Sequence, residues 1–71
     1  MEHNKVFNQK IRDILIAKRK QKGWTKAELS RRTHISQQLL CDIESGRRNP
    51  SLNSIVAIAK ALELSLDKIL L

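Results

Sequence analysis

A chain of 71 residues has room for one compact core, and its 41% hydrophobic and 30% charged residues favour a folded domain and exclude a disordered tail. The single cysteine, Cys41, excludes an intramolecular disulfide, and the lack of clustered Cys and His predicts a cytoplasmic protein with no metal and no cofactor. Fourteen Lys and Arg against seven Asp and Glu give a net charge of +7, which favours a polyanionic partner such as nucleic acid.

The apolar pattern disfavours a membrane protein. Residues 1–7 form a polar N-terminus, and the longest apolar runs, 14–17 and 55–59, fall far below the roughly 18 residues of a membrane span. A membrane-surface helix needs a continuous apolar face opposite its basic residues, whereas the one Trp and the one Phe lie in different segments. We therefore expect residues 1–71 to form a single soluble domain, with residues 1–4 as a frayed tail.

The first predicted helix covers about residues 5–22 and ends at Gly23. Five residues follow the three- and four-residue spacing of a helix face, so the apolar ones among them share one stripe; the five are Phe7, Ile11, Ile14, Leu15 and Lys18. Basic residues gather at its C-terminal end, where the helix dipole favours cations; they are Lys18, Arg19, Lys20 and Lys22.

Two short helices follow. Thr25 and Glu28 have the spacing of a capping box, and Trp24 can pack on Leu29 as a hydrophobic staple, so a helix is predicted over residues 26–32. The same offsets recur at the next apolar and hydroxyl residues, and they predict a helix over residues 37–44; the residues concerned are Ile35, Ser36 and Leu40.

The rest of the chain predicts two more helices. Gly46 closes the third helix, and residues 49–51 form a turn in which Ser51 can cap a helix over residues 52–62. The buried stripe of that helix is predicted to be Leu52, Ile55, Val56, Ala59 and Leu62. Staple offsets at Leu64, Ser65 and Ile69 predict a last helix over residues 66–70. The chain is therefore predicted to be all-α, with five helices and no strand.

The second and third helices have the layout of a helix-turn-helix, because a turn of about three residues, 33–35, joins them. Ser30 is small enough to let the two helices approach each other. The residues spaced to form the core beneath them are Leu29, Ile35, Leu40 and Ile43.

Residues 24–52, WTKAELSRRTHISQQLLCDIESGRRNPSL, resemble the Cro/CI-like (XRE) family of helix-turn-helix proteins, with IESGRRNPSL as the most specific part. The resemblance continues through KALELSLDKIL and is weaker in the first helix. It implies a compact five-helix, lambda-repressor-like DNA-binding domain with the helix-turn-helix at its second and third helices.

The resemblance places Ser36, Gln37 and Gln38 where the family's recognition helix presents its first turn to the bases. A Gln amide matches the N6 and N7 edge of adenine, and each bidentate contact gives roughly 1 to 3 kcal/mol of discrimination. Cys41 and Asp42 lie about one turn further along the outward face and are further base-reading candidates. Each assignment has an alternative. Gln37 and Gln38 could be solvated helix residues without a DNA contact, and Cys41 could be a small residue with no role, which is favoured over a redox sensor. The negative charge of Asp42 could repel phosphate instead of reading a base.

Candidate phosphate-binding residues surround this helix. Thr25 and Lys26 lie at the N-terminus of the second helix, and Arg47, Arg48 and Asn49 follow the third. A helix N-terminus supplies N–H donors, and Lys and Arg supply countercharge. The alternative for the two arginines is a solvated basic loop.

The resemblance also implies that Arg19 and Glu44 form a structural ion pair that fixes the recognition helix against the first helix. Two departures from the family pattern affect the details. His34 stands at the turn position usually held by Gly, so it either adopts a left-handed conformation or reshapes the turn. Lys26 replaces the usual Gln, which exchanges an amide that can brace a recognition residue for a point charge.

Family members without another domain usually dimerise, which would place two recognition helices roughly 34 Å apart, one turn of DNA. The candidate dimer interface is the far end of the fourth helix together with the fifth, and its residues are Ile58, Leu66, Ile69, Leu70 and Leu71. The alternative is that these side chains only cover the domain's own core.

The sequence thus predicts a sequence-specific regulator of transcription that binds double-stranded DNA. It is expected to act as a homodimer on an inverted repeat and to be located in the cytoplasm, associated with the nucleoid. Its subclasses include a restriction-modification controller, a phage-type repressor and a mobile-element regulator. The alternative is an antitoxin-type protein-interaction module that binds DNA secondarily. An enzyme is disfavoured by the lack of paired carboxylates, of a nucleophile with a base and of a Gly-rich phosphate loop, and we expect no small-molecule ligand.

Overall fold

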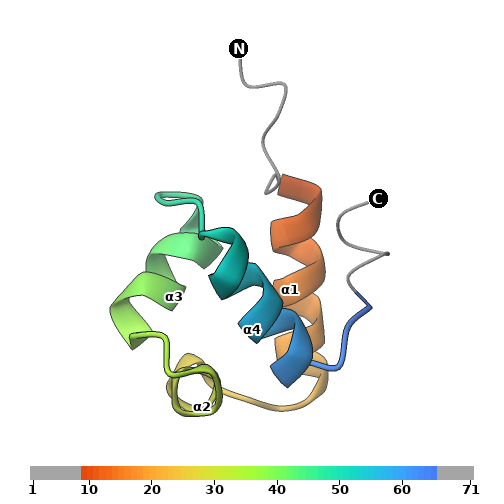
Figure 1. Cartoon of the computed structure of the whole chain (residues 1–71). Helices are drawn as coiled ribbons and strands as arrows, with labels where there is room; N and C mark the ends of the chain where they lie inside the picture. Colours follow the sequence, from red (N-terminus) through yellow and green to blue (C-terminus); the bar gives the residue numbers. More distant parts are fainter. Residues whose placement is uncertain (1–8, 66–71) are drawn as a thin grey trace.

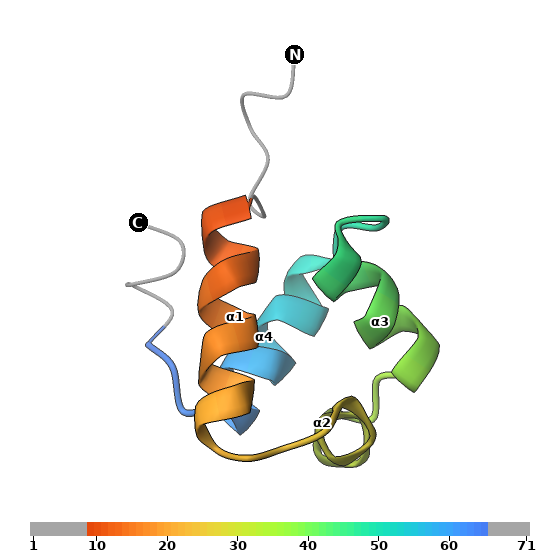
Figure 2. The ribbon, with the colours of Figure 1, turned by 180° about the vertical axis from the view of Figure 1, so that it is seen from behind.

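The computed structural model describes residues 9–65, which form four helices. They are α1 (Gln9–Gln21), α2 (Lys26–Thr33), α3 (Gln37–Ser45) and α4 (Leu52–Ala61). In Figure 1, α1 and α3 stand at the two sides of the view, α4 crosses between them, and α2 closes the lower end, seen nearly end-on. Figure 2 shows the same arrangement from behind. Helices alone make up the secondary structure of this described part, as the all-α prediction required.

The fifth helix, predicted over residues 66–70, lies outside the described residues, and so do residues 5–8 of the first predicted helix. The structure therefore tests four of the five predicted helices, and all four are present. Their bounds agree with the predicted ones to within one residue at each end that the structure describes.

Side-chain caps start three of the helices at the predicted positions. Thr25, Ser36 and Ser51 have extended backbones, and each hydroxyl accepts a hydrogen bond of 3.1 Å from the backbone N–H three residues later. A cap of this kind contributes about 0.5–2 kcal/mol, because the N–H groups of the first helical turn have no partner within the helix. Local sequence therefore determines where α2, α3 and α4 begin.

The turn between α2 and α3 is built around a left-handed His34, with φ 62° and ψ 24°. Of the two outcomes that the sequence left open, the structure shows this one. The His34 N–H donates to the Ser30 carbonyl at 2.8 Å, and the Ser30 hydroxyl donates to the Ile35 carbonyl at 2.5 Å. Ser30 thus ties the turn to α2 as well as allowing the two helices to approach.

The core collects apolar side chains from all four helices and from the residue that follows α4. Its buried members are Ile11, Leu15, Leu29, Leu40, Ile43, Ile55, Ile58, Ala59 and Leu62. α2 packs against both α3 and α4, and α1 packs against α3. The two helices of the predicted helix-turn-helix are therefore anchored on a common core and are not a surface appendage.

Two predictions about α4 are wrong. Leu52, predicted to be buried, is 54% exposed, whereas Ile58, predicted to lie in a dimer interface, is 1% exposed inside the core. Leu52 shares a face of α4 with Ala59, seven positions later, so its exposure follows from its place as the first residue of the helix. The buried face of α4 runs through Ile55, Ile58, Ala59 and Leu62 at helical spacing. Ile58 is enclosed by its own monomer and has almost no surface left for a partner.

The buried face of α1 includes a residue that its apolar stripe did not contain. Ile14 and Lys18 are half-buried, while Arg19 is 8% exposed beside Ile11 and Leu15. The buried stripe therefore ends on a charged residue, and such a residue requires a partner inside the fold.

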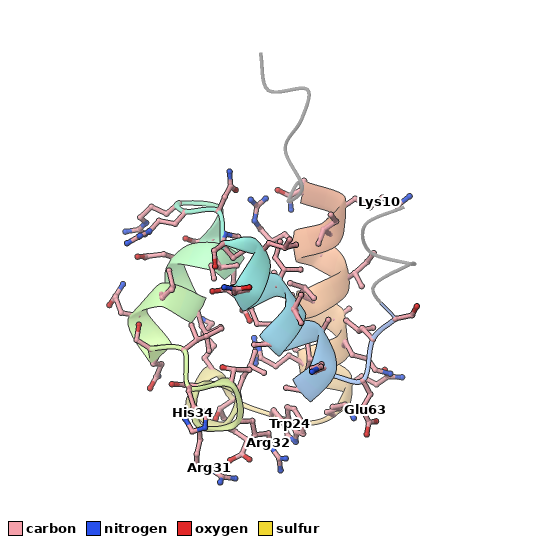
Figure 3. All side chains as sticks on the ribbon, in the orientation of Figure 1. Lys10, Trp24, Arg31, Arg32, His34 and Glu63 are labelled. Atoms are coloured by element: carbon pink, nitrogen blue, oxygen red, sulfur yellow. The ribbon has the colours of Figure 1, made fainter. Side chains whose placement is uncertain are left out.

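Charged side chains cover the outer face of α2 (Figure 3). The Arg32 guanidinium lies 4.2 Å from the centroid of the Trp24 ring, and Trp24 also packs against the core. The Glu28 carboxylate accepts hydrogen bonds from Arg31 and Arg32 at 2.5 and 2.6 Å. Only one half of the predicted capping box is present in the described residues, because the Glu28 N–H is capped by Thr25 but the carboxylate is bonded to the two arginines.

Leu40→Ala should lower the free energy of unfolding by about 2–5 kcal/mol, because it leaves a cavity at a position that is 1% exposed. Leu52→Ala is the matched control and should change stability by less than about 0.5 kcal/mol, since that side chain is 54% exposed. Urea denaturation followed by circular dichroism measures both. Equal losses at the two positions would contradict the burial of Leu40 and the exposure of Leu52 in this structure.

The pKa of the Glu28 carboxyl is lowered, first by its hydrogen bond to Arg31 and further by its hydrogen bond to Arg32. A lowered pKa in the folded state means that the pair stabilises the fold above the ordinary Glu pKa and that this contribution is lost as the pH falls through the lowered value. NMR titration of the carboxyl should show that Arg31→Ala moves the pKa back toward the ordinary value. An unchanged titration curve in that variant would show that Arg31 is not the cause.

Candidate nucleic-acid interface

The outward face of α3 carries the predicted base-reading residues. Gln37, Gln38 and Cys41 are exposed, while Leu40 and Ile43 on the opposite face are buried in the core. Ser36 is also exposed, but its hydroxyl is occupied as the N-cap of α3 and accepts from the backbone N–H of the third residue after it. The first turn of α3 thus presents two amide side chains to solvent from a helix whose position the core determines.

Asp42 was predicted on the outward face of the recognition helix, but its side chain is largely enclosed by neighbouring residues. Its side chain is 13% exposed, and its Oδ1 accepts a hydrogen bond of 3.1 Å from the Gln38 amide and lies 3.7 Å from Nε of Arg47. The carboxylate is therefore directed at Gln38 within α3 and lies near Arg47 in the loop that follows α3. Gln38 keeps one amide hydrogen and its carbonyl oxygen for another partner, because the NH₂ group has two hydrogens.

The N-terminus of α2 lies beside α3 and borders an open groove. Thr25 is exposed at the cap, and Lys26 is half-buried at the first helical position. The groove is lined by Ile16, Arg19, Lys20, Lys26, Cys41, Glu44 and Ser45. Lys20 was predicted only as a favourable charge at the end of α1, and no sequence pattern indicated that the fold brings it to the same groove as Lys26.

The loop after α3 forms the other border of this face. Arg47, Arg48 and Asn49 are exposed, while the backbone N–H groups of the two arginines donate to the Asp42 carbonyl at 2.8 and 3.2 Å. Gly46 permits this return of the chain because it adopts a φ of +85°, where an L side chain would be strained. The guanidinium groups therefore project from a loop whose backbone is tied to the end of α3.

The ion pair predicted between Arg19 and Glu44 is present and bidentate. Arg19 Nε and Nη2 donate to the two carboxylate oxygens at 2.7 and 3.0 Å, and Nη1 donates to the Trp24 carbonyl at 2.7 Å. The two side chains are only 10% and 13% exposed. One guanidinium thus joins α1, the chain entering α2 and the last turn of α3.

The side chains on this face can form hydrogen bonds and attract anions. Two exposed amides lie on one helical turn, and cationic side chains lie at both of its borders. None of the helices in residues 9–65 is both long enough and apolar enough to cross a membrane.

Comparison with known proteins agrees with this geometry. The sequence profile of the helix-turn-helix family matches residues 15–69, which include α2, α3 and α4 in full. This chain belongs to the helix-turn-helix family. The resemblance to its Cro/CI-like members that the sequence suggested is therefore confirmed.

Three relatives show the extent of the similarity. The uncharacterized HTH-type transcriptional regulator y4dJ of Sinorhizobium fredii is 43% identical over 47 residues, 66% of this chain and 61% of the relative. The immunity repressor protein of Bacillus phage phi105 is 37% identical over 64 residues, 90% of this chain and 42% of the relative. The transcriptional regulator ClgR of Mycobacterium tuberculosis is 36% identical over 66 residues, 93% of this chain and 59% of the relative.

The chain therefore spans between 42% and 61% of the length of these relatives. No solved structure gave a significant match.

Glu44→Ala should lower the free energy of unfolding by about 3–5 kcal/mol, because it leaves the Arg19 guanidinium buried without its carboxylate. The control is Glu63→Ala, which breaks the ion pair of an exposed carboxylate with Lys22 and should leave stability almost unchanged. Replacing both partners, as Arg19→Met with Glu44→Leu, should recover part of the loss. Chemical denaturation measures all three, and a Glu44→Ala variant as stable as Glu63→Ala would refute the role given to the buried pair.

Proposed function

We propose that this chain regulates transcription by binding double-stranded DNA at a specific sequence, with α3 as the helix that enters the major groove. One observation carries the proposal: the first turn of α3 exposes Gln37 and Gln38 while its opposite face is buried in the core. A helix that is to read base edges needs both properties, because its side chains must reach the groove from a fixed direction.

The residues of this face divide into two groups with different effects on binding. The two glutamines supply donor and acceptor pairs that match adenine, while Ser36 caps the helix and Cys41 lies one turn further on the same face. Asp42 holds Gln38, and we assign it a bracing role before a reading one.

Phosphate contacts fall to the residues at the borders of the face, and they determine affinity and register. These residues are Thr25, Lys26, Arg47, Arg48 and Asn49, to which the structure adds Lys20 as a candidate.

The proposed active form is a homodimer on an inverted repeat. One copy of α3 covers a half-site, and a twofold pair places two copies roughly 34 Å apart in successive major grooves. The predicted interface residues Leu66, Ile69, Leu70 and Leu71 lie outside the described residues, so this part of the proposal rests on their apolar character and no longer includes Ile58.

The proposed role is that of a small repressor or restriction-modification controller in the cytoplasm, associated with the nucleoid and without enzymatic turnover. The name of the phage phi105 relative, an immunity repressor, supports repression as the mode of action. The net charge of +7 supports association with DNA.

Selection of bound duplexes from a random DNA pool tests this function. The expected outcome is enrichment of an inverted repeat, with centres of the half-sites about 10 base pairs or a multiple of this apart. A chain that enriches no sequence and ignores every duplex at low ionic strength would refute the proposed function.

Gln37→Ala and Gln38→Ala should each reduce the preference for the selected operator over a mutated one, by about 1–3 kcal/mol for each base pair that the amide no longer reads. Arg47→Ala and Arg48→Ala should instead weaken binding to all duplexes and lower the slope of log K against log salt by about 1 for each phosphate left unbound. Gln21→Ala, an exposed amide on α1, is the matched control and should change neither quantity. Fluorescence anisotropy at several salt concentrations separates the two effects, and identical behaviour of both groups would contradict the division.

A further inference from the structure

We propose that Arg12 is a positioning residue for DNA recognition, which holds the C-terminal end of α3 and thereby the direction of its reading face. This inference rests on the proposed function and names a residue that the sequence did not single out. Arg12 lies on α1, and its contact with α3 joins residues 31 positions apart in the chain.

One hydrogen bond of Arg12 reaches the end of α3, and another joins its side chain to its own helix. Its Nε donates a hydrogen bond of 3.0 Å to the Ile43 carbonyl, and its Nη1 donates at 2.9 Å to the side-chain oxygen of Gln9. Gln9 in turn donates to Asp13 at 2.7 Å. The guanidinium carbon also lies 3.5 Å from where a Cβ on Gly46 would stand, so the side chain is packed against the turn that leads out of α3.

The charge at the C-terminal end of α3 explains why a contact with a cation is favourable there. The last carbonyls of a helix carry partial negative charge and lack partners within the helix. The Ile43 carbonyl accepts from the Gly46 N–H at 3.2 Å, and its second lone pair accepts from Arg12. None of the residues in the last turn of α3, residues 42–45, is basic, and Asp42 and Glu44 there are acidic. Arg12 therefore supplies from α1 the cation that this helix end does not carry itself.

Two arginines of α1 then fix α3 at neighbouring points. Arg12 and Arg19 are seven positions apart, which places them on the same face of α1. Arg19 holds the carboxylate of Glu44, and Arg12 holds the carbonyl of the residue before it. The two polar contacts, spaced along α1, add to the buried Leu40 and Ile43 in holding the last turn of α3.

Loss of the Arg12 contact should also affect the reading face, because Gln38 and the loop after α3 are both bonded to Asp42 in the last turn of α3. The carbonyl of Asp42 accepts from the backbone of Arg47 and Arg48, and its carboxylate accepts from Gln38. A shift of this last turn would move the loop and the braced amide together. Without Arg12, recognition of the correct bases should therefore suffer while the number of cationic contacts to phosphate stays the same.

The test compares Arg12→Ala with Lys10→Ala, which removes one charge from an exposed position on α1 (Figure 3). The measured quantity is the ratio of affinities for the selected operator and for an unrelated duplex. Arg12→Ala should lower this ratio by about 2- to 30-fold with an unchanged salt slope, whereas Lys10→Ala should leave the ratio unchanged. Arg12→Lys, which keeps a cation near the carbonyl, should recover part of the ratio.

Two outcomes of the affinity measurement would overturn the inference. An unchanged ratio in folded Arg12→Ala would show that Arg12 has no part in recognition. An equal loss of affinity for both duplexes, with a salt slope lower by about 1, would show that Arg12 binds phosphate directly.

Hydrogen exchange separates a failure of this inference from a failure of the proposed function. In Arg12→Ala the N–H groups of Arg47 and Arg48 should exchange faster, while the Leu29 N–H, bonded to Thr25 in α2, should keep its rate. If the wild-type chain selects no DNA, the proposed function fails, and the exchange result still decides whether Arg12 holds the end of α3. Unchanged exchange at both arginines would refute it.

Discussion

The structure depends on a buried guanidinium that has three partners. Arg19 is 8% exposed, and its donors reach both oxygens of Glu44 and the Trp24 carbonyl. A charge removed from water needs an opposite charge and satisfied hydrogen bonds, or it destabilises the fold by several kcal/mol. This arrangement satisfies both needs and joins α1 to the last turn of α3 and to the chain that enters α2.

In the proposed function, stability and recognition both depend on the nine residues of α3. Its period of 3.6 residues separates a buried face, with Leu40 and Ile43, from an exposed face, with Gln37 and Gln38. The core thus orients the amides without touching them. Any change that moves the buried face by a fraction of a turn also rotates the amides. In the proposed function, core packing therefore influences specificity as well as stability.

Local features of this fold could be predicted from the sequence, and features that need two distant segments could not. The caps at Thr25, Ser36 and Ser51 act within one turn, so spacing alone predicted them and the starts of their helices. The burial of Ile58 depends on how α4 rotates against the rest of the core, and the Arg12 contact depends on where α1 meets the end of α3. Arg19 and Glu44 were predicted because a family resemblance carries such tertiary information.

Asp42 shows what the proposed function asks of this surface beyond positive charge. A carboxylate within a basic face weakens attraction to every phosphate, so it lowers affinity for all DNA alike. At the same time it accepts from Gln38 and lies beside Arg47, which restricts the rotamers of a side chain that would otherwise be ordered only on binding. A net charge of +7 already provides non-specific attraction in excess. Asp42 therefore lowers the affinity for all DNA slightly and holds the Gln38 side chain in place before binding. This combination favours discrimination between sequences, which a regulator of transcription needs.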